Sequence, residues 1–398
     1  MSTAEATIER PRSRIPTQWD VIVIGGGSAG SLVSRQLARA GARALLVESK
    51  HFPREKVCGG YLNNRAIQVL NQTGLYGTLV SDRQPEPQML EVIAGRQRAR
   101  FSLPPATIVC RPEFDERLLH AAEDAGVTVV TGAQAIVEPA ANPQARAVTV
   151  IRHNTRELHR SQVVICADGL SRTSIRHLPE FNVTTQAASR VGIGAVVPDD
   201  IAPGSPRQIT MIVTSRGYIG ISRIDDHRLN IAAAVEPALL AHRAPADLAS
   251  SMLTAAGIAV PPQLATAPWR GTPPLTSCAA RVAAQRVFLV GDAAGYVEPF
   301  TGEGMAAAFE SAIAITPIAL RAIECWTLAV EQAWQSSHRE LVRNRQFTCR
   351  RLAWIVRHPW ATQATLTTCR LVPRIASRMI ANTTRPAPSA PSPLAARL

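Results

Sequence analysis

The first part of the chain alternates short apolar runs with a segment of helical spacing. Val21–Ile24 and Ala44–Glu48 are apolar runs of strand length, and glycine follows the first of them directly. Between the two runs, apolar residues recur at the spacing of one helix face until Gly41, at Leu32, Val33, Leu37 and Ala40. The pattern predicts a strand, a helix and a second strand of a buried parallel sheet.

Later segments extend this sheet. Further buried strands are predicted at Val127–Val130, 162–166 and 286–290. Helices are predicted over Arg111–Ala125, with Pro112 in the first turn, and over Met305–Ile323.

A second pattern has strands with no helices between them. We expect such strands at Met89–Ile93, Ala99–Leu103, Val191–Val197, Gln208–Thr214, Tyr218–Arg223 and Leu229–Val235, with one helix at Ala246–Ala256. Ala147–Arg152 and Thr155–Arg160 are predicted to form an antiparallel ribbon. The fold class is therefore α/β (α+β overall), with a Rossmann-type parallel sheet, an antiparallel β lobe and C-terminal helices.

These patterns divide the chain of 398 residues into two lobes and two tails. The nucleotide-binding lobe is predicted to be discontinuous, over 18–75, 106–180 and 276–325, and the β lobe to span 76–105 and 181–275. C-terminal helices are expected over 326–385. Disordered tails are expected at 1–17 and 386–398, the second because it is rich in Pro, Ser and Ala.

The turn after the first strand carries the spacing Gly25-x-Gly27-x-x-Gly30. Such glycines allow a tight turn, a close approach of a pyrophosphate and close packing of helix on strand. The next strand ends in Glu48, 18 residues after Gly30, where a carboxylate can accept hydrogen bonds from an adenosine ribose. An acid here favours FAD or NAD over NADP.

Two more segments combine a strand end with acid and glycine. One strand closes with Asp168-Gly169, and another closes with Gly291-Asp292 and leads to Gly302-Glu303-Gly304 at a helix start. Asp292 can bind ribityl hydroxyls, and the amides around Gly302 to Gly304 can stabilise negative charge on a reduced flavin. No second Gly-x-Gly-x-x-Gly opens a strand–helix–strand unit, so a reductant such as NADPH or NADH would bind only transiently.

The formal net charge is +13, and all but two of the basic residues are Arg. The charge reflects either genome composition or attraction to an anionic partner. Nucleic acid is not expected, because no nucleic-acid-binding motif accompanies the charge. The region from Arg339 to Asn382 has nine Arg and one acid, with Trp354 and Trp360 among aliphatic residues. It predicts either a helical buttress or a peripheral membrane contact.

Seven scattered cysteines lack metal-ligand spacing, so no metal is expected. The odd count favours a reduced, cytoplasmic protein. The apolar runs predict no transmembrane span, and the first 17 residues lack the apolar core of a secretory signal.

Several segments together resemble the FAD-dependent monooxygenase and geranylgeranyl-reductase superfamily, which has a para-hydroxybenzoate-hydroxylase-like fold. They are Gly25–Glu48, Pro53–Gly60, Arg111–Asp115, Asp168-Gly169 and Gly291–Gly304. The stretches Pro53-Arg-Glu-Lys56-Val-Cys58-Gly59-Gly60 and Gly291–Gly304 look most like the geranylgeranyl-reductase branch. The resemblance implies FAD held by Glu48, Arg111, Asp168 and Asp292. The full set expected at the cofactor is Gly25, Gly27, Ser28, Ala29, Gly30, Glu48, Ser49, Lys56, Arg111, Asp168, Asp292, Gly302 and Gly304.

The chain departs from the family pattern in two places. Ser171 and Arg176 each miss the usual offset after Asp168-Gly169 by one position. The segment Gly217–Arg223 lacks the Trp and Pro of geranylgeranyl reductases, and it also lacks the paired Trp of flavin-dependent halogenases. These departures weaken the prenyl-reductase interpretation and argue against halogenation.

Two enzymatic hypotheses follow. The favoured one is an NAD(P)H-dependent monooxygenase that hydroxylates an aromatic or polyketide-like hydrophobic molecule through a flavin C4a-hydroperoxide, with Tyr218 or Arg223 as the polar handle. The alternative is a reductase that saturates an alkene of a prenyl or lipid substrate, with Lys56 and Cys58 near the flavin. Cys58 could equally serve only the packing of its loop. A non-catalytic flavoprotein is a third reading.

Overall fold

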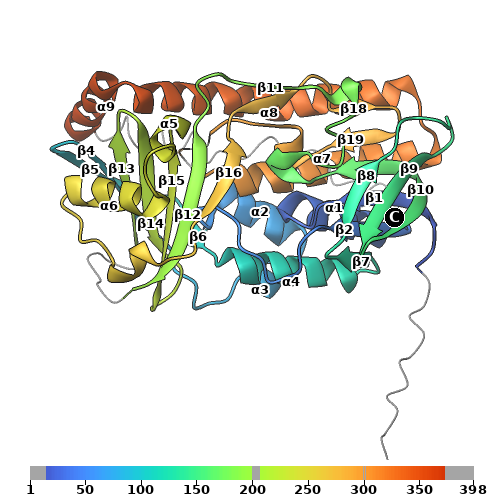
Figure 1. Cartoon of the computed structure of the whole chain (residues 1–398), viewed down its shortest axis with the longest axis horizontal. Coiled ribbons are helices and arrows are strands. Elements are labelled where there is room, and N and C mark those ends of the chain that lie inside the picture. Colours follow the sequence, from blue (N-terminus) through green and yellow to red (C-terminus); the bar gives the residue numbers. More distant parts are fainter. Residues whose placement is uncertain (1–14, 200–206, 299, 301, 373–398) are drawn as a thin grey trace, which may run out of the picture.

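The computed structural model describes residues 15–199, 207–298, 300 and 302–372. Figure 1 shows two lobes side by side, with the C-terminal helices running along one side of both. Of the predicted tail at 1–17, residues 1–14 lie outside the described residues, whereas Ile15 packs against the main core and the carbonyl oxygen of Thr17 accepts a hydrogen bond from the backbone of Arg160. The predicted tail at 386–398 and the part of the C-terminal region beyond residue 372 also lie outside the described residues.

The nucleotide-binding lobe is built on a mainly parallel sheet with the strand order β18-β19-β10-β1-β2-β7. Its strands are β1 (Gln18–Ile24), β2 (Ala44–Glu48), β7 (Thr128–Thr131), β10 (Thr155–Cys166), β18 (Ala283–Ala284) and β19 (Val287–Leu289), and β8 (Gln134–Val137) and β9 (Arg146–Arg152) extend it. The predicted ribbon is present as the antiparallel pair β9–β10. However, β10 is one continuous strand rather than two, because Ser161 stays in register with both Arg146 of β9 and Trp19 of β1.

Register explains why distant segments meet. Ile24 of β1 lies beside Val47 of β2 on one side and Cys166 of β10 on the other, and Cys166 lies beside Leu289 of β19. The residues that follow these four parallel strands therefore emerge at one edge of the sheet.

Helices α1 (Ser28–Arg39), α4 (Arg111–Glu123) and α7 (Gly304–Glu324) pack together over this sheet. Helix α7 is long and apolar enough to span a membrane by length and composition alone, but half of its most apolar stretch is buried inside the protein. Its buried residues, such as Phe309, Ala312 and Ile315, belong to the main hydrophobic core. In this fold α7 is a core helix.

The second lobe is a seven-stranded sheet with the order β16-β12-β15-β14-β13-β4-β5. Its strands are β4 (Met89–Ala94), β5 (Gln97–Ser102), β12 (Val191–Pro198), β13 (Gln208–Thr214), β14 (Gly217–Arg223), β15 (Arg228–Val235) and β16 (Arg270–Pro274). The strands pair antiparallel as predicted, except that β13 and β4 are parallel. The segment between β5 and β12 passes through the other lobe before the chain returns to this sheet. No short hairpin joins β4 to β13, so the two strands can run in the same direction.

The two faces of this sheet have different covers. Ile193, Ile212 and Ile231 face α6 (Pro245–Ala255) and form one apolar cluster with it. Val213 and Tyr218 belong to a second cluster that includes Val356 and Leu366 of the C-terminal helices, α8 (Leu328–Arg357) and α9 (Pro359–Leu371). The C-terminal helices therefore brace the β lobe.

Smaller elements complete the described fold. They are the strands β3 (Tyr61–Leu62), β6 (Thr107–Ile108), β11 (Val183–Thr185), β17 (Ser277–Ala279) and β20 (Gly295–Tyr296), with the helices α2 (Asn64–Gln72), α3 (Tyr76–Leu79) and α5 (Pro237–Leu240). The side chain of Asn63 caps α2 by accepting a hydrogen bond from the backbone of Ala66.

Candidate flavin site

The glycine turn after β1 is as tight as its spacing predicts. Gly25 has a φ of +103°, and a Cβ there would lie 2.5 Å from the carbonyl oxygen of Ala167. A Cβ at Gly30 would overlap the carbonyl oxygen of Gly25. Gly27 precedes the first residue of α1, so the helix presents its N-terminal amides beside the turn.

The carboxylate of Glu48 is fixed at the end of β2. One oxygen accepts a hydrogen bond from the backbone of Gly26 at 2.8 Å, and the other accepts from the backbone of Lys50 at 2.9 Å and from the Ser49 hydroxyl at 3.1 Å. The carboxylate is buried and still faces the cavity described below. This orientation suits an acceptor for ribose hydroxyls.

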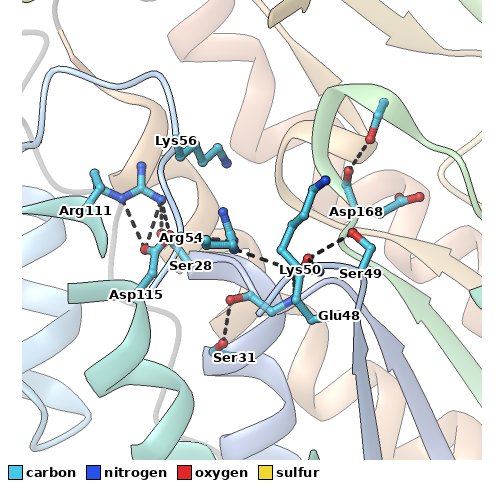
Figure 2. A network of polar contacts seen from close by, with 12 residues as sticks. Ser28, Ser31, Glu48, Ser49, Lys50, Arg54, Lys56, Arg111, Asp115 and Asp168 are labelled. Carbon is cyan, nitrogen blue, oxygen red and sulfur yellow. Dashed lines mark hydrogen bonds and ion pairs between the residues drawn. The ribbon is translucent and has the colours of Figure 1, made fainter. Parts of the chain in front are cut away.

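Arg54 is a site residue that the sequence pattern did not single out. Figure 2 shows it between the Arg111–Asp115 pair and Glu48. Its Nε lies 3.8 Å from Glu48 Oε2, and its Nη2 lies 3.6 Å from Asp115 Oδ2. The buried Nε has no hydrogen-bond partner. The sequence did offer one indication of this role: Arg54 is in the same loop as the predicted site residue Lys56, and Arg is a common ligand for phosphate.

Arg111 begins α4 and forms a two-pronged pair with Asp115, one helical turn later. Its Nη2 lies 2.8 Å from Asp115 Oδ2, and the same nitrogen lies 3.5 Å from the Ser28 hydroxyl. Burial alone would lower the pKa of Arg111, but the neighbouring Asp115 carboxylate outweighs it and the pKa is raised. The guanidinium therefore stays charged beside the N-terminus of α1.

Asp168 follows β10 and presents an unused oxygen. Its Oδ2 accepts hydrogen bonds from the backbone and hydroxyl of Ser174, at 3.0 and 2.9 Å. Its buried Oδ1 has no hydrogen-bond partner. Burial raises the pKa of Asp168, although the bonds from Ser174 oppose this.

Asp292 lies in the turn after β19, where Lys56 approaches it with Nζ 3.8 Å from Oδ2. Arg172 ties this turn to the one that holds Asp168, by donating to the carbonyl oxygens of Asp292 and Ala293 at 2.9 and 2.7 Å. Ser171 and Arg176 each miss the family offset by one position, and the residue that joins the two turns is Arg172. It was missed because its backbone has a left-handed φ of +45°, which sequence spacing does not reveal.

The loop from Lys56 to Gly60 separates this edge from the β lobe. Asn230 of β15 donates to the carbonyl oxygen of Cys58 at 2.8 Å, and Ser222 of β14 donates to that of Gly59 at 3.3 Å. Val57 packs over Gly194 of β12, where a Cβ would lie 3.2 Å from its side chain. The loop is therefore a fixed wall shared by both lobes.

One cavity of about 750 Å³ joins these groups. Of the predicted residues, it is lined by Gly25, Gly27, Ser28, Ala29, Glu48, Ser49, Lys56, Cys58, Arg111, Asp168, Asp292 and Gly304. Gly30 and Gly302 do not line it. Gly30 acts through helix packing, and Gly302 has a φ of +70° with Tyr61 packed against it.

The two predicted polar handles of the β lobe lie away from this cavity lining. Arg223 pairs with Asp199 at 2.8 Å. Tyr218 is buried edge-on against Phe300, with ring centroids 5.1 Å apart, and burial raises its pKa well above the usual value. Tyr296, which the sequence pattern did not single out, lines the cavity beside Gly304 instead.

The donors and acceptors fit FAD. The Oδ1 of Asp168 and the Nε of Arg54 are buried atoms without a hydrogen-bond partner on residues that line the cavity, so a bound ligand can satisfy them. Glu48 suits the ribose, Arg54 and Arg111 suit phosphates, and the start of α7 suits the pyrimidine edge of the ring. Among the residues that the structure describes, no group of His, Cys, Asp and Glu side chains is placed to hold a metal ion.

Relatives of known structure show the same fold. The flavin-dependent brominase Bmp2 superposes with a TM-score of 0.76 at 16% identity, over 92% of this chain and 94% of that one. PqsL, a probable FAD-dependent monooxygenase from Pseudomonas aeruginosa, superposes with a TM-score of 0.68 at 19% identity, over 88% of this chain and all of that one. At these identities the likeness concerns the fold alone, and the prediction against halogenation stays a prediction.

Sequence comparison gives the family. A menaquinone reductase of Mycobacterium tuberculosis is 28% identical over 305 residues, which is 72% of each chain. Residues 18–318 match the family model for the FAD binding domain, about three quarters of the chain. The predicted flavoprotein family is thereby confirmed: the chain belongs to the family of flavin-dependent oxidoreductases that carry this FAD-binding domain.

Proposed function

We propose that the chain is an NADPH- or NADH-dependent flavin monooxygenase that hydroxylates an aromatic or polyketide-like hydrophobic molecule. The observation that carries this proposal is a set of apolar side chains that line the same cavity as Asp292 and Gly304. They come from four separate segments, and they are Val57, Leu170, Pro273, Leu275 and Met305.

Bound FAD would supply the redox chemistry at its ring. The chain supplies binding through Glu48, Arg54 and Arg111, and orientation through Asp292 and the start of α7. The amides of α7 stabilise negative charge on a ring placed there. The apolar side chains would keep water from a ring bound beside them, which such oxygen chemistry requires.

A second candidate, reduction of an alkene in a prenyl or lipid molecule, is favoured by a different observation. Lys56 and Cys58 line the cavity, whereas Tyr218 and Arg223 do not. The ammonium of Lys56 could deliver a proton to the substrate. The relative from Mycobacterium tuberculosis bears the name menaquinone reductase, and the substrate we propose for this candidate is therefore an alkene in the prenyl tail of a quinone-type lipid.

Two measurements separate the candidates. In air, the FAD-loaded protein and NADPH are mixed with phenols of increasing chain length, and oxygen uptake is followed. Uptake stimulated by substrate, with a product heavier by one oxygen atom, supports the monooxygenase. Anaerobic saturation of a prenyl double bond of a menaquinone by the dithionite-reduced protein, read as a gain of two hydrogen atoms that persists after the quinone ring is reoxidised, with no stimulated oxygen uptake in air, supports the reductase and overturns our first proposal.

Variants of the loop add a further test. Lys56→Met and Cys58→Ser are compared for FAD content and for turnover. Loss of turnover in Lys56→Met with FAD retained would assign Lys56 to the reaction. Full turnover in both variants would show that the loop serves only as a wall.

A further inference from the structure

Two tryptophans are exposed where α8 meets α9. Trp354, in the last turn of α8, is 49% exposed, and Trp360, in the first turn of α9, is 64% exposed. Their rings pack edge-on with centroids 5.7 Å apart, and Trp354 also stacks on His358 at 4.5 Å. We call Trp354, His358 and Trp360 the tryptophan corner. Large aromatic groups exposed together mark an interaction surface.

The exposed apolar side chains continue along one face of α9. Leu371 follows Trp360 by eleven residues, which is close to three helical turns, and is 77% exposed. Ala364 and Thr367 lie between them on the same exposed face. The side chains that point the other way, such as Ala361 and Leu366, are buried against the β lobe. This face of α9 therefore carries no acidic group, and it has a large apolar side chain at each end, Trp360 and Leu371.

The part of the chain that forms the corner carries charged side chains of one sign only, although Arg357 between the two tryptophans pairs with the buried Glu298 of another segment at 3.2 Å. The chain has no Asp or Glu after Glu340, and it has ten Arg between residues 341 and 398. Arg350 and Arg351 lie one helical turn before Trp354 and are exposed, as is Arg370 near the end of α9. Tryptophans flanked by arginines match the boundary between lipid headgroups and acyl chains, where the indole ring is favoured and the guanidinium meets phosphate.

A small apolar cavity lies directly beside the corner. Its volume is about 300 Å³, and it is lined by Val356 and Pro359 of the corner helices and by Val213 and Met252 of the β lobe. Val356 and Val213 belong to the apolar cluster that reaches Leu275 and Tyr296 at the flavin cavity. The corner is thus continuous with the apolar interior of the β lobe.

We propose that the tryptophan corner is a peripheral docking surface for an anionic lipid bilayer. Trp354 and Trp360 sit at the level of the headgroups, and Arg350, Arg351 and Arg370 face lipid phosphates. Helix α9 lies along the membrane surface. This inference does not depend on which flavin reaction the chain carries out.

The test is co-sedimentation of the full, FAD-loaded chain with two kinds of vesicle at 50 mM salt. One is phosphatidylcholine alone, and the other contains one third phosphatidylglycerol. We expect binding to the anionic vesicles to be at least about tenfold tighter, because several guanidinium groups contribute. The double variant Trp354→Ala/Trp360→Ala should lose about tenfold or more of that affinity. Leu328→Ala removes an equally exposed apolar side chain from the far end of α8 and is the matched control.

The outcomes are decisive in both directions. Loss of binding in the double tryptophan variant, with Leu328→Ala unchanged and FAD absorbance retained in both, supports the proposal. Equal binding by the double variant, or no binding of the full chain to anionic vesicles, overturns it. Sedimentation equilibrium without lipid tests whether a second copy of the chain binds the corner instead. A dimer that is lost in the double variant would show that it does, and this also overturns the proposal.

Discussion

The ammonium of Lys56 lies 3.8 Å from the carboxylate of Asp292, although they come from opposite ends of the nucleotide-binding lobe. The contact joins the loop after β2 to the turn after β19, on two sides of the flavin cavity. Asp292 also belongs to a turn whose carbonyl groups are held by Arg172. Its carboxylate is therefore placed before any ligand arrives.

We expect Asp292→Ala to weaken FAD binding by about 10- to 100-fold, because a hydrogen bond to a charged group is worth about 1.5–3 kcal/mol. The dissociation constant is measured by quenching of flavin fluorescence as apoprotein is titrated into FAD. Asp226→Ala, in an exposed turn of the β lobe, is the control. An unchanged constant for Asp292→Ala would remove this residue from the cofactor site.

We expect Arg54 to contribute as much to FAD affinity as the predicted Arg111. Its Nε is buried without a hydrogen-bond partner, so the free protein already bears the cost of desolvating it. We expect Arg54→Ala to lower FAD affinity by about tenfold or more and to reduce the salt dependence of binding. Arg54→Lys should restore part of the affinity. The control is Arg96→Ala, in the exposed hairpin between β4 and β5, and equal salt dependence in Arg54→Ala and the control would contradict the assignment.

The parts of the site that follow parallel strands were predictable from the sequence. Gly25, Glu48, Asp168 and Asp292 each follow a buried apolar run, and parallel strands end at a common edge. Arg172 and Arg54 could not be found in this way, because their roles depend on a left-handed backbone and on a loop path across the cavity. Tyr218 shows the opposite limit. It was predicted to be a polar contact for the substrate, but its ring is buried against Phe300 and does not line the cavity.

The adjacent glycines of the loop should respond differently to alanine. Gly60 has a φ of +67°, and a Cβ there would overlap the carbonyl oxygen of Val109. Gly59 has open space at its Cβ position. We expect Gly60→Ala to lower the free energy of unfolding by about 2–4 kcal/mol, from backbone strain and overlap together. Gly59→Ala should change it by less than about 1 kcal/mol, as measured by denaturant unfolding of the FAD-loaded protein. Equal losses in both variants would show that this part of the loop is arranged differently.

His338 should make the protein sensitive to mild acid. It lies in α8 beside Trp334, with ring centroids 5.7 Å apart, and burial lowers its pKa from 6.5 to about 4. As the pH falls below 6.5, the unfolded chain binds a proton at this residue before the folded chain does, so stability is lost progressively down to about pH 4. The full loss from this one group is on the order of 3 kcal/mol. In His338→Gln, the free energy of unfolding should fall less steeply between pH 6.5 and pH 4 than in the parent chain.

His153→Gln, in an exposed turn between β9 and β10, is the control and should keep the parent slope. Parallel curves for His338→Gln and the parent chain would show that the folded protein protonates His338 as readily as the unfolded chain.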